Sequence, residues 1–125
     1  EQERRAVADA RAWADECQLV FVEGVSDMQM VGGAGFDLRL FDAHDSEVQI
    51  EVKGYRTDDL ADVHLQPSQV ARARDAAAGN PPPWFLHVLL KAHSKSPERR
   101  ALTAAEAVAL LETGQLDRHG KHALV

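Results

Sequence analysis

The sequence has few of the residues that build disulfide-bonded, membrane-spanning or strongly basic proteins. Its 125 residues include one cysteine, Cys17, which excludes an intrachain disulfide and a cysteine-rich zinc site. No apolar run approaches the about 20 residues of a membrane-spanning helix, and no signal peptide is visible. A single thiol is typical of a reducing compartment, so we expect a cytoplasmic protein that does not bind a membrane.

Positive charge is also scarce. The chain has 14 Lys and Arg against 20 Asp and Glu, for a net charge of −6. This balance excludes a strongly basic, non-specific nucleic-acid coat. It does not exclude a nuclease, because catalytic carboxylates add negative charge that a bound metal would offset. We expect residues 1–125 to form a single domain, and the start at Glu1 rather than Met fits a domain excised from a longer protein.

The spacing of apolar residues predicts three helices. They are expected at residues 3–18, 65–79 and 103–114. In the first helix, small and apolar side chains recur at helical spacing from Ala6 to Cys17. We therefore expect Ala6 and Cys17 to be buried. Pro67 suits the first turn of the second helix. Thr103 and Glu106 form a capping-box pattern at the start of the third.

Four segments have the composition of strands. They are expected at residues 18–23, 36–42, 48–55 and 84–92. The second and third alternate apolar and polar residues on either side of the turn-like segment 43–47, which predicts an antiparallel hairpin. The fourth is an almost continuous apolar run, as expected for a strand covered on both faces, and a loop is expected at 93–100. His87 is expected either in the core or on a strand face. The order αβββαβα predicts an α/β fold with a mixed central sheet flanked by helices.

The segment IEVKG (50–54) contains the strongest candidates for catalytic residues. Side chains alternate along a strand, so Glu51 and Lys53 share one face while Ile50 and Val52 share the other. Asp37 lies on the less apolar face of the neighbouring predicted strand. Phosphodiester hydrolysis needs a metal held by carboxylates, an activated water and a positive group, and these residues would supply them. The alternative is a plain ion pair on an exposed sheet.

The ordered set GFD (35–37), IEVKG (50–54) and LQPSQ (65–69) resembles the PD-(D/E)XK, or restriction endonuclease-like, nuclease superfamily. Within it, the set is similar to the domain found at the C-terminus of the NO VEIN protein and in many bacterial helicase- and ATPase-linked defence or repair proteins. The resemblance covers roughly residues 3–92. It implies a restriction endonuclease-like αβββαβ core, followed here by a C-terminal helix. Phe36 stands where the superfamily name has Pro, which leaves the catalytic residues in place.

The resemblance also implies residue roles. Asp37 and Glu51 would bind Mg²⁺ or Mn²⁺, and Lys53 would orient or activate the water and stabilise charge. Gln69, at a helix start where related domains often carry Glu, would assist catalysis; a plain helix-start polar residue is the alternative. Arg72 lies three residues further on the same helix face. It is expected either to bind a nucleic-acid phosphate or to be a solvated arginine.

The predicted function is metal-dependent endonuclease cleavage of DNA, as a module in genome defence or repair, with RNA a second candidate substrate. The expected partners are DNA, other domains or subunits of a larger assembly, and a second copy, since paired cuts in a duplex need two sites. The alternative is a catalytically inactive nuclease-like module for nucleic-acid binding or protein docking. The negative charge favours that alternative, whereas the intact Asp37, Glu51 and Lys53 set disfavours it. Gly54 is expected to allow close approach of another backbone or a substrate.

Overall fold

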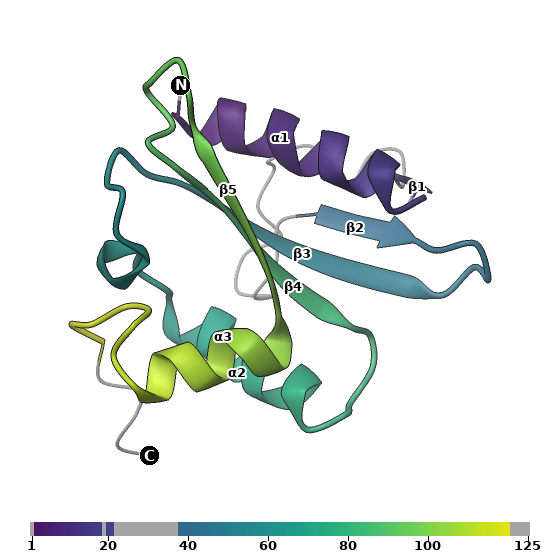
Figure 1. Cartoon of the computed structure of the whole chain (residues 1–125). Coiled ribbons are helices and arrows are strands. Elements are labelled where there is room, and N and C mark those ends of the chain that lie inside the picture. Colours follow the sequence, from purple (N-terminus) through teal and green to yellow (C-terminus); the bar gives the residue numbers. More distant parts are fainter. Residues whose placement is uncertain (1, 19, 22–37, 121–125) are drawn as a thin grey trace.

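The computed structural model describes residues 2–18, 20–21 and 38–120 (Figure 1). Within these residues the helices are α1 (Gln2–Glu16), α2 (Pro67–Ala77) and α3 (Ala104–Glu112), with a short 3₁₀ turn, η1 (Leu60–Asp62), before α2. The strands are β1 (Val20–Phe21), β2 (Leu38–Phe41), β3 (Glu47–Gly54), β4 (Trp84–Leu90) and β5 (Glu98–Thr103). None of the helices in the described residues is long and apolar enough to cross a bilayer.

The strands form one mixed sheet in the order β1-β2-β3-β4-β5. The predicted hairpin is confirmed, because β2 and β3 are antiparallel and pair Leu38 with Ile50 and Leu40 with Val48. Strands β3 and β4 are parallel, and α2 makes the crossover between them. The predicted mixed α/β sheet flanked by helices, with a further helix near the C-terminus, is therefore confirmed.

Helix α1 covers one face of the sheet, and α2 and α3 cover the other (Figure 1). The buried cluster beneath α1, here called the α1-side core, consists of Ala6, Val7, Ala10, Ala14, Leu38, Leu40, Ile50, Val52, Leu89 and Ala92. The helix contributes mainly alanine, so its backbone lies close to the strands. Trp13 packs against the edge of this core, with its ring 5.5 Å from that of Phe85.

Gly54, at the end of β3, is required by this close approach. A Cβ atom added there would lie 2.4 Å from the backbone oxygen of Gln2 and 3.1 Å from the Cβ of Ala6. The first separation is shorter than any ordinary contact, so α1 would have to move. The expectation that another backbone approaches Gly54 is confirmed, and that backbone is the first turn of α1.

The opposite face carries the larger core, here called the α2-side core. Its buried members are Val63, Leu65, Val70, Ala73, Trp84, Leu86, Val88, Leu90, Ala104, Ala107, Leu111 and Leu116. The capping box predicted for α3 is present, because the Thr103 hydroxyl accepts from the Glu106 N–H and the Glu106 carboxylate accepts from the Thr103 N–H. These reciprocal bonds fix the start of α3 over the sheet.

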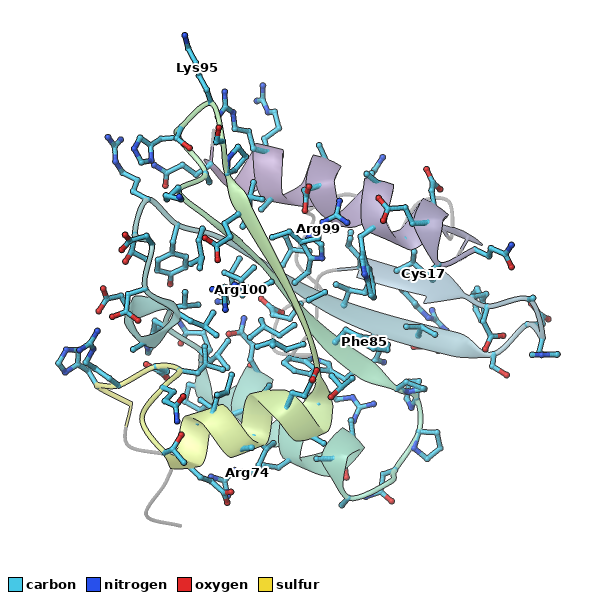
Figure 2. All side chains as sticks on the ribbon, viewed as in Figure 1. Cys17, Arg74, Phe85, Lys95, Arg99 and Arg100 are labelled. Atoms are coloured by element: carbon cyan, nitrogen blue, oxygen red, sulfur yellow. The ribbon has the colours of Figure 1, made fainter. Side chains whose placement is uncertain are left out.

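Two expectations were wrong. The last three residues of the predicted loop 93–100 belong to β5, which pairs antiparallel with β4 at the edge of the sheet. An edge strand takes its stability from the hydrogen-bonded ladder and carries charged side chains, so its apolar pattern is weak. Arg99 lies on the α1 side of β5 and Arg100 on the other (Figure 2). Cys17 is exposed rather than buried, because α1 ends at Glu16.

Candidate active site

Strand β3 separates its polar and apolar side chains as predicted. Ile50 and Val52 lie in the α1-side core, while Glu51 faces α2 and contacts the side chain of Gln69. The Glu51 side chain is only 2% exposed and that of Lys53 15% exposed, with 3.7 Å between Oε2 of Glu51 and Nζ of Lys53. This burial contradicts the alternative of an ion pair on an exposed sheet. The two residues form the centre of the candidate site.

Gln69 joins this pair from the first turn of α2. Its Nε2 donates to Oε2 of Glu51 at 2.7 Å, and its Oε1 accepts from the backbone N–H of Gln66 at 2.7 Å. Only the amide oxygen can accept that N–H, so the hydrogen-bond network assigns the nitrogen to the Glu51 side. Gln69 therefore caps the helix with one end and holds the carboxylate with the other.

A second contact between α2 and β3 lies beside the first. Arg72 Nε donates to Oε1 of Gln49 at 2.7 Å, and another guanidinium nitrogen donates to the carbonyl of Pro82. A third lies 3.4 Å from Asp75, and the Arg72 side chain is 11% exposed. Arg72 is thus not the solvated arginine considered as an alternative. Its guanidinium binds the protein on all three nitrogens, and phosphate binding by Arg72 stays a prediction.

Gln49 was not among the predicted site residues. It is 7% exposed and lies on the same face as Glu51 and Lys53, two residues before Glu51. Its own amide nitrogen donates to Oε2 of Glu47 at 2.9 Å. Because side chains alternate along a strand, a polar residue two positions before Glu51 must share its face, and this was the signal that would have identified Gln49. It matters because it connects Arg72 to the hairpin that carries the site.

The metal-binding prediction concerns Asp37 and Glu51. Asp37 lies outside the described residues, and within residues 38–120 and the described N-terminal part no three His, Cys, Asp or Glu side chains gather at one point. The chemistry of Glu51 fits Mg²⁺ or Mn²⁺, because these hard cations take carboxylate oxygens and often need only one or two from the protein. Gln69 turns its nitrogen toward Glu51, so it acts here as a support for the carboxylate rather than as a ligand.

A different polar network lies on the other face of the sheet. Asp9 of α1 accepts from His87 Nε2 at 2.7 Å and from Arg99 Nε at 2.8 Å, and Arg99 also lies 3.3 Å from Glu16. Burial lowers the pKa of His87, which is 0% exposed, although Asp9 opposes this. Burial alone would raise the pKa of Asp9, but the bonds from Arg99 and His87 outweigh it and lower that pKa. His87 is confirmed as a core residue, and we call these four residues the Asp9 network.

Comparison with curated proteins finds no match, and comparison with solved structures also finds none. A family model described as protein NO VEIN, C-terminal, matches residues 2–106. The match includes α1, the sheet, α2 and every candidate site residue. Because it covers most of the 125 residues, the chain belongs to the family of NO VEIN C-terminal domains.

Proposed function

We propose that this domain is a metal-dependent nuclease that hydrolyses phosphodiester bonds of DNA. The observation that carries the proposal is the buried carboxylate of Glu51, held 2.7 Å from the Gln69 amide and 3.7 Å from the Lys53 amine. A buried carboxylate is costly, and an apolar residue would serve a purely structural strand better. Buried, preorganised acids beside a cation are typical of catalytic sites.

Each residue has a distinct role in the proposal. Glu51 and Asp37 would hold the Mg²⁺ or Mn²⁺ ion. When bound, the ion supplies Lewis-acid stabilisation of the charge that develops on the phosphate. Lys53 carries donors only, so its ammonium would orient the attacking water and stabilise the same charge. Gln69 is a positioning residue, because it fixes the Glu51 carboxylate without needing to touch the substrate.

The proposal places one requirement on Asp37. In the sequence Asp37 directly precedes Leu38, whose partner across the hairpin is Ile50, the residue before Glu51. Asp37 must therefore reach the Glu51 carboxylate from the β2 side of the hairpin. The set GFD, IEVKG and LQPSQ supports this assignment through its resemblance to PD-(D/E)XK nucleases. The same resemblance supports a role as one module of a larger assembly in genome defence or repair.

A cleavage assay tests the proposal. The chain would be incubated with supercoiled and linear DNA in Mg²⁺, in Mn²⁺ and in EDTA, beside Asp37→Ala, Lys53→Ala and the control Arg4→Gln. Arg4 is an exposed residue of α1, on the face of the sheet opposite Glu51. We expect metal-dependent nicking by the unchanged chain and by the control, and its loss in the two site variants.

Two results would contradict the proposal. Equal product from the unchanged chain and both site variants would mean that a contaminant or another site cleaves the DNA. DNA binding without cleavage under any metal condition would favour the inactive nuclease-like module, which the net charge of −6 also favours. An RNA of the same sequence, tested in parallel, would show which nucleic acid is the better substrate.

A further inference from the structure

Several polar side chains of β2 and β3 lie on the face of the sheet that holds Glu51, with the ring of Phe41 beside Arg39 on the same face. The register pairs Arg39 with Gln49, so Arg39 shares this face and is a diagonal neighbour of Glu51. Diagonal neighbours in an antiparallel pair lie about 7–8 Å apart, within reach of a long side chain. Arg39 is 41% exposed, in contrast to Gln49 and Glu51. Its side chain is therefore accessible to solvent and to a ligand.

Other cations near the site are placed less favourably. Arg72 is committed to protein partners on each guanidinium nitrogen. Arg100 shares the face of Lys53, but Val88 of β4 lies between them in the register, and Arg100 bonds to Glu98 at 2.8 Å. Among these three arginines, Arg39 alone is on the strand next to Glu51 and substantially exposed.

The contacts of Arg39 position its guanidinium but leave it able to bind another anion. Its Nη2 lies 3.1 Å from Oε1 of Glu47, and its guanidinium lies 5.9 Å from the ring centroid of Phe41. Such exposed ion pairs contribute little to stability. Glu47 also accepts a hydrogen bond from Gln49 through its other oxygen. Glu47 would thus keep one partner if Arg39 turned to another anion.

We propose that Arg39 binds a backbone phosphate of the nucleic acid beside the Glu51–Lys53 site, exchanging its contact with Glu47 for that phosphate. A guanidinium offers two parallel donors to a phosphate, and the acidic chain needs such a local cation to hold a polyanion. Glu47 then acts as a competing internal anion that sets the strength of binding. The inference rests on the proposed substrate class, but it concerns binding and does not require cleavage.

Binding measurements separate the two proposals. The full chain would be titrated into a short fluorescein-labelled DNA duplex, with Ca²⁺ in place of Mg²⁺, across a series of salt concentrations. Arg39→Gln is expected to bind about fivefold more weakly at low salt, with a log–log salt slope shallower by about one. Arg39→Lys is expected to keep the slope and lose part of the affinity. Glu47→Gln is expected to bind severalfold more tightly.

Control variants remove the general effect of net charge. Arg4→Gln and Asp15→Asn make the same charge changes on exposed residues of α1, and circular dichroism checks that each variant is folded. If Arg39→Gln binds like Arg4→Gln, the inference is overturned while the nuclease proposal stands. If the unchanged chain does not bind the duplex, the inference is overturned, and the nicking assay alone decides the nuclease proposal. An Arg39 effect on binding in a chain that never cleaves supports the inference and overturns only the nuclease.

Discussion

An acidic side chain lies against each face of the β3–β4 pair, but the two differ in burial and in partners: Asp9 is 25% exposed and Glu51 is 2% exposed. Asp9 accepts from an imidazole and from a guanidinium that contacts both of its oxygens, so cationic or polar partners compensate its charge directly. Glu51 is more deeply buried; it accepts a hydrogen bond from the neutral Gln69 amide, and the Lys53 ammonium lies 3.7 Å from it. The first arrangement ties α1 to β4 and β5. The second holds a buried carboxylate beside the Lys53 amine, and this is the arrangement on which the proposed nuclease role depends.

The largest expected difference is in activity. Glu51→Gln keeps the shape of the side chain and removes its charge, so cleavage should fall at least about 100-fold with little change in thermal unfolding. Asp9→Asn should do the reverse, with lower stability and unchanged cleavage by the folded protein. Plasmid nicking and differential scanning calorimetry measure the two effects. Loss of cleavage in a folded Asp9→Asn protein would break the distinction between the two acids.

Asp9→Ala should have the largest effect on stability. It leaves the buried His87 and the half-buried Arg99 without their shared carboxylate. Removing one partner of a buried pair costs about 3–5 kcal/mol, and Asp9 is 25% exposed, so we expect about 3 kcal/mol less unfolding free energy. Urea unfolding measures this value. Asp15→Ala, on the exposed side of α1, is the control and should change it by less than about 0.5 kcal/mol.

Gly54→Ala tests how closely α1 must lie to the strand that carries the site. The added methyl group would meet the Gln2 carbonyl at 2.4 Å, so the N-terminal turn of α1 must move. We expect a loss of about 2 kcal/mol in unfolding free energy, within the usual range for overpacking. Cleavage by the folded protein should survive, because Glu51 and Lys53 face the other way. An unchanged unfolding free energy in Gly54→Ala would show that the first turn of α1 can move away from β3 at little cost.

Gln69→Glu puts a second carboxylate 2.7 Å from Oε2 of Glu51. In EDTA we expect about 1–2 kcal/mol less stability, because like charges would meet in a buried position. Added Mg²⁺ or Mn²⁺ should recover more stability in this variant than in the unchanged chain, since the new carboxylate offers another oxygen ligand. Thermal unfolding with and without metal measures this, and Gln115→Glu is an exposed control. An identical metal response in both variants would argue against a cation site at Glu51.

The smallest effect concerns pH and belongs to the Asp9 network. The pKa of His87 is lowered from 6.5, so below pH 6.5 the unfolded chain binds a proton that the folded chain does not, and stability falls as pH falls toward the lowered value. The pKa of Asp9 is lowered from 3.8, so its contribution is lost in a second step below pH 3.8. Urea unfolding above and below pH 6.5 measures the first step. His87→Gln should remove it, and an unchanged profile would contradict the assignment.

Much of the site was predictable because it is local. Period-two alternation placed Glu51 and Lys53 on one face of β3, and the position of Gln69 after Pro67 placed it in the first turn of α2. The contacts of Gln49 and Arg72 were not predictable in the same way. They depend on how α2 lies across β3, and neither residue belongs to a motif. Asp37 as a metal ligand, DNA as the substrate and a cytoplasmic location stay predictions.

The sequence by itself determined the helices and inner strands, the hairpin and the polar face of β3, because periodicity and capping act between neighbours along the chain. Only the tertiary structure decided that Glu51 is buried, that Arg72 binds Gln49 and Pro82, and that β5 joins the sheet. It also brought Asp9, His87 and Arg99 together from three separate elements. The physical reason is that burial and long-range pairing depend on which surfaces meet, and residues far apart in sequence decide this jointly.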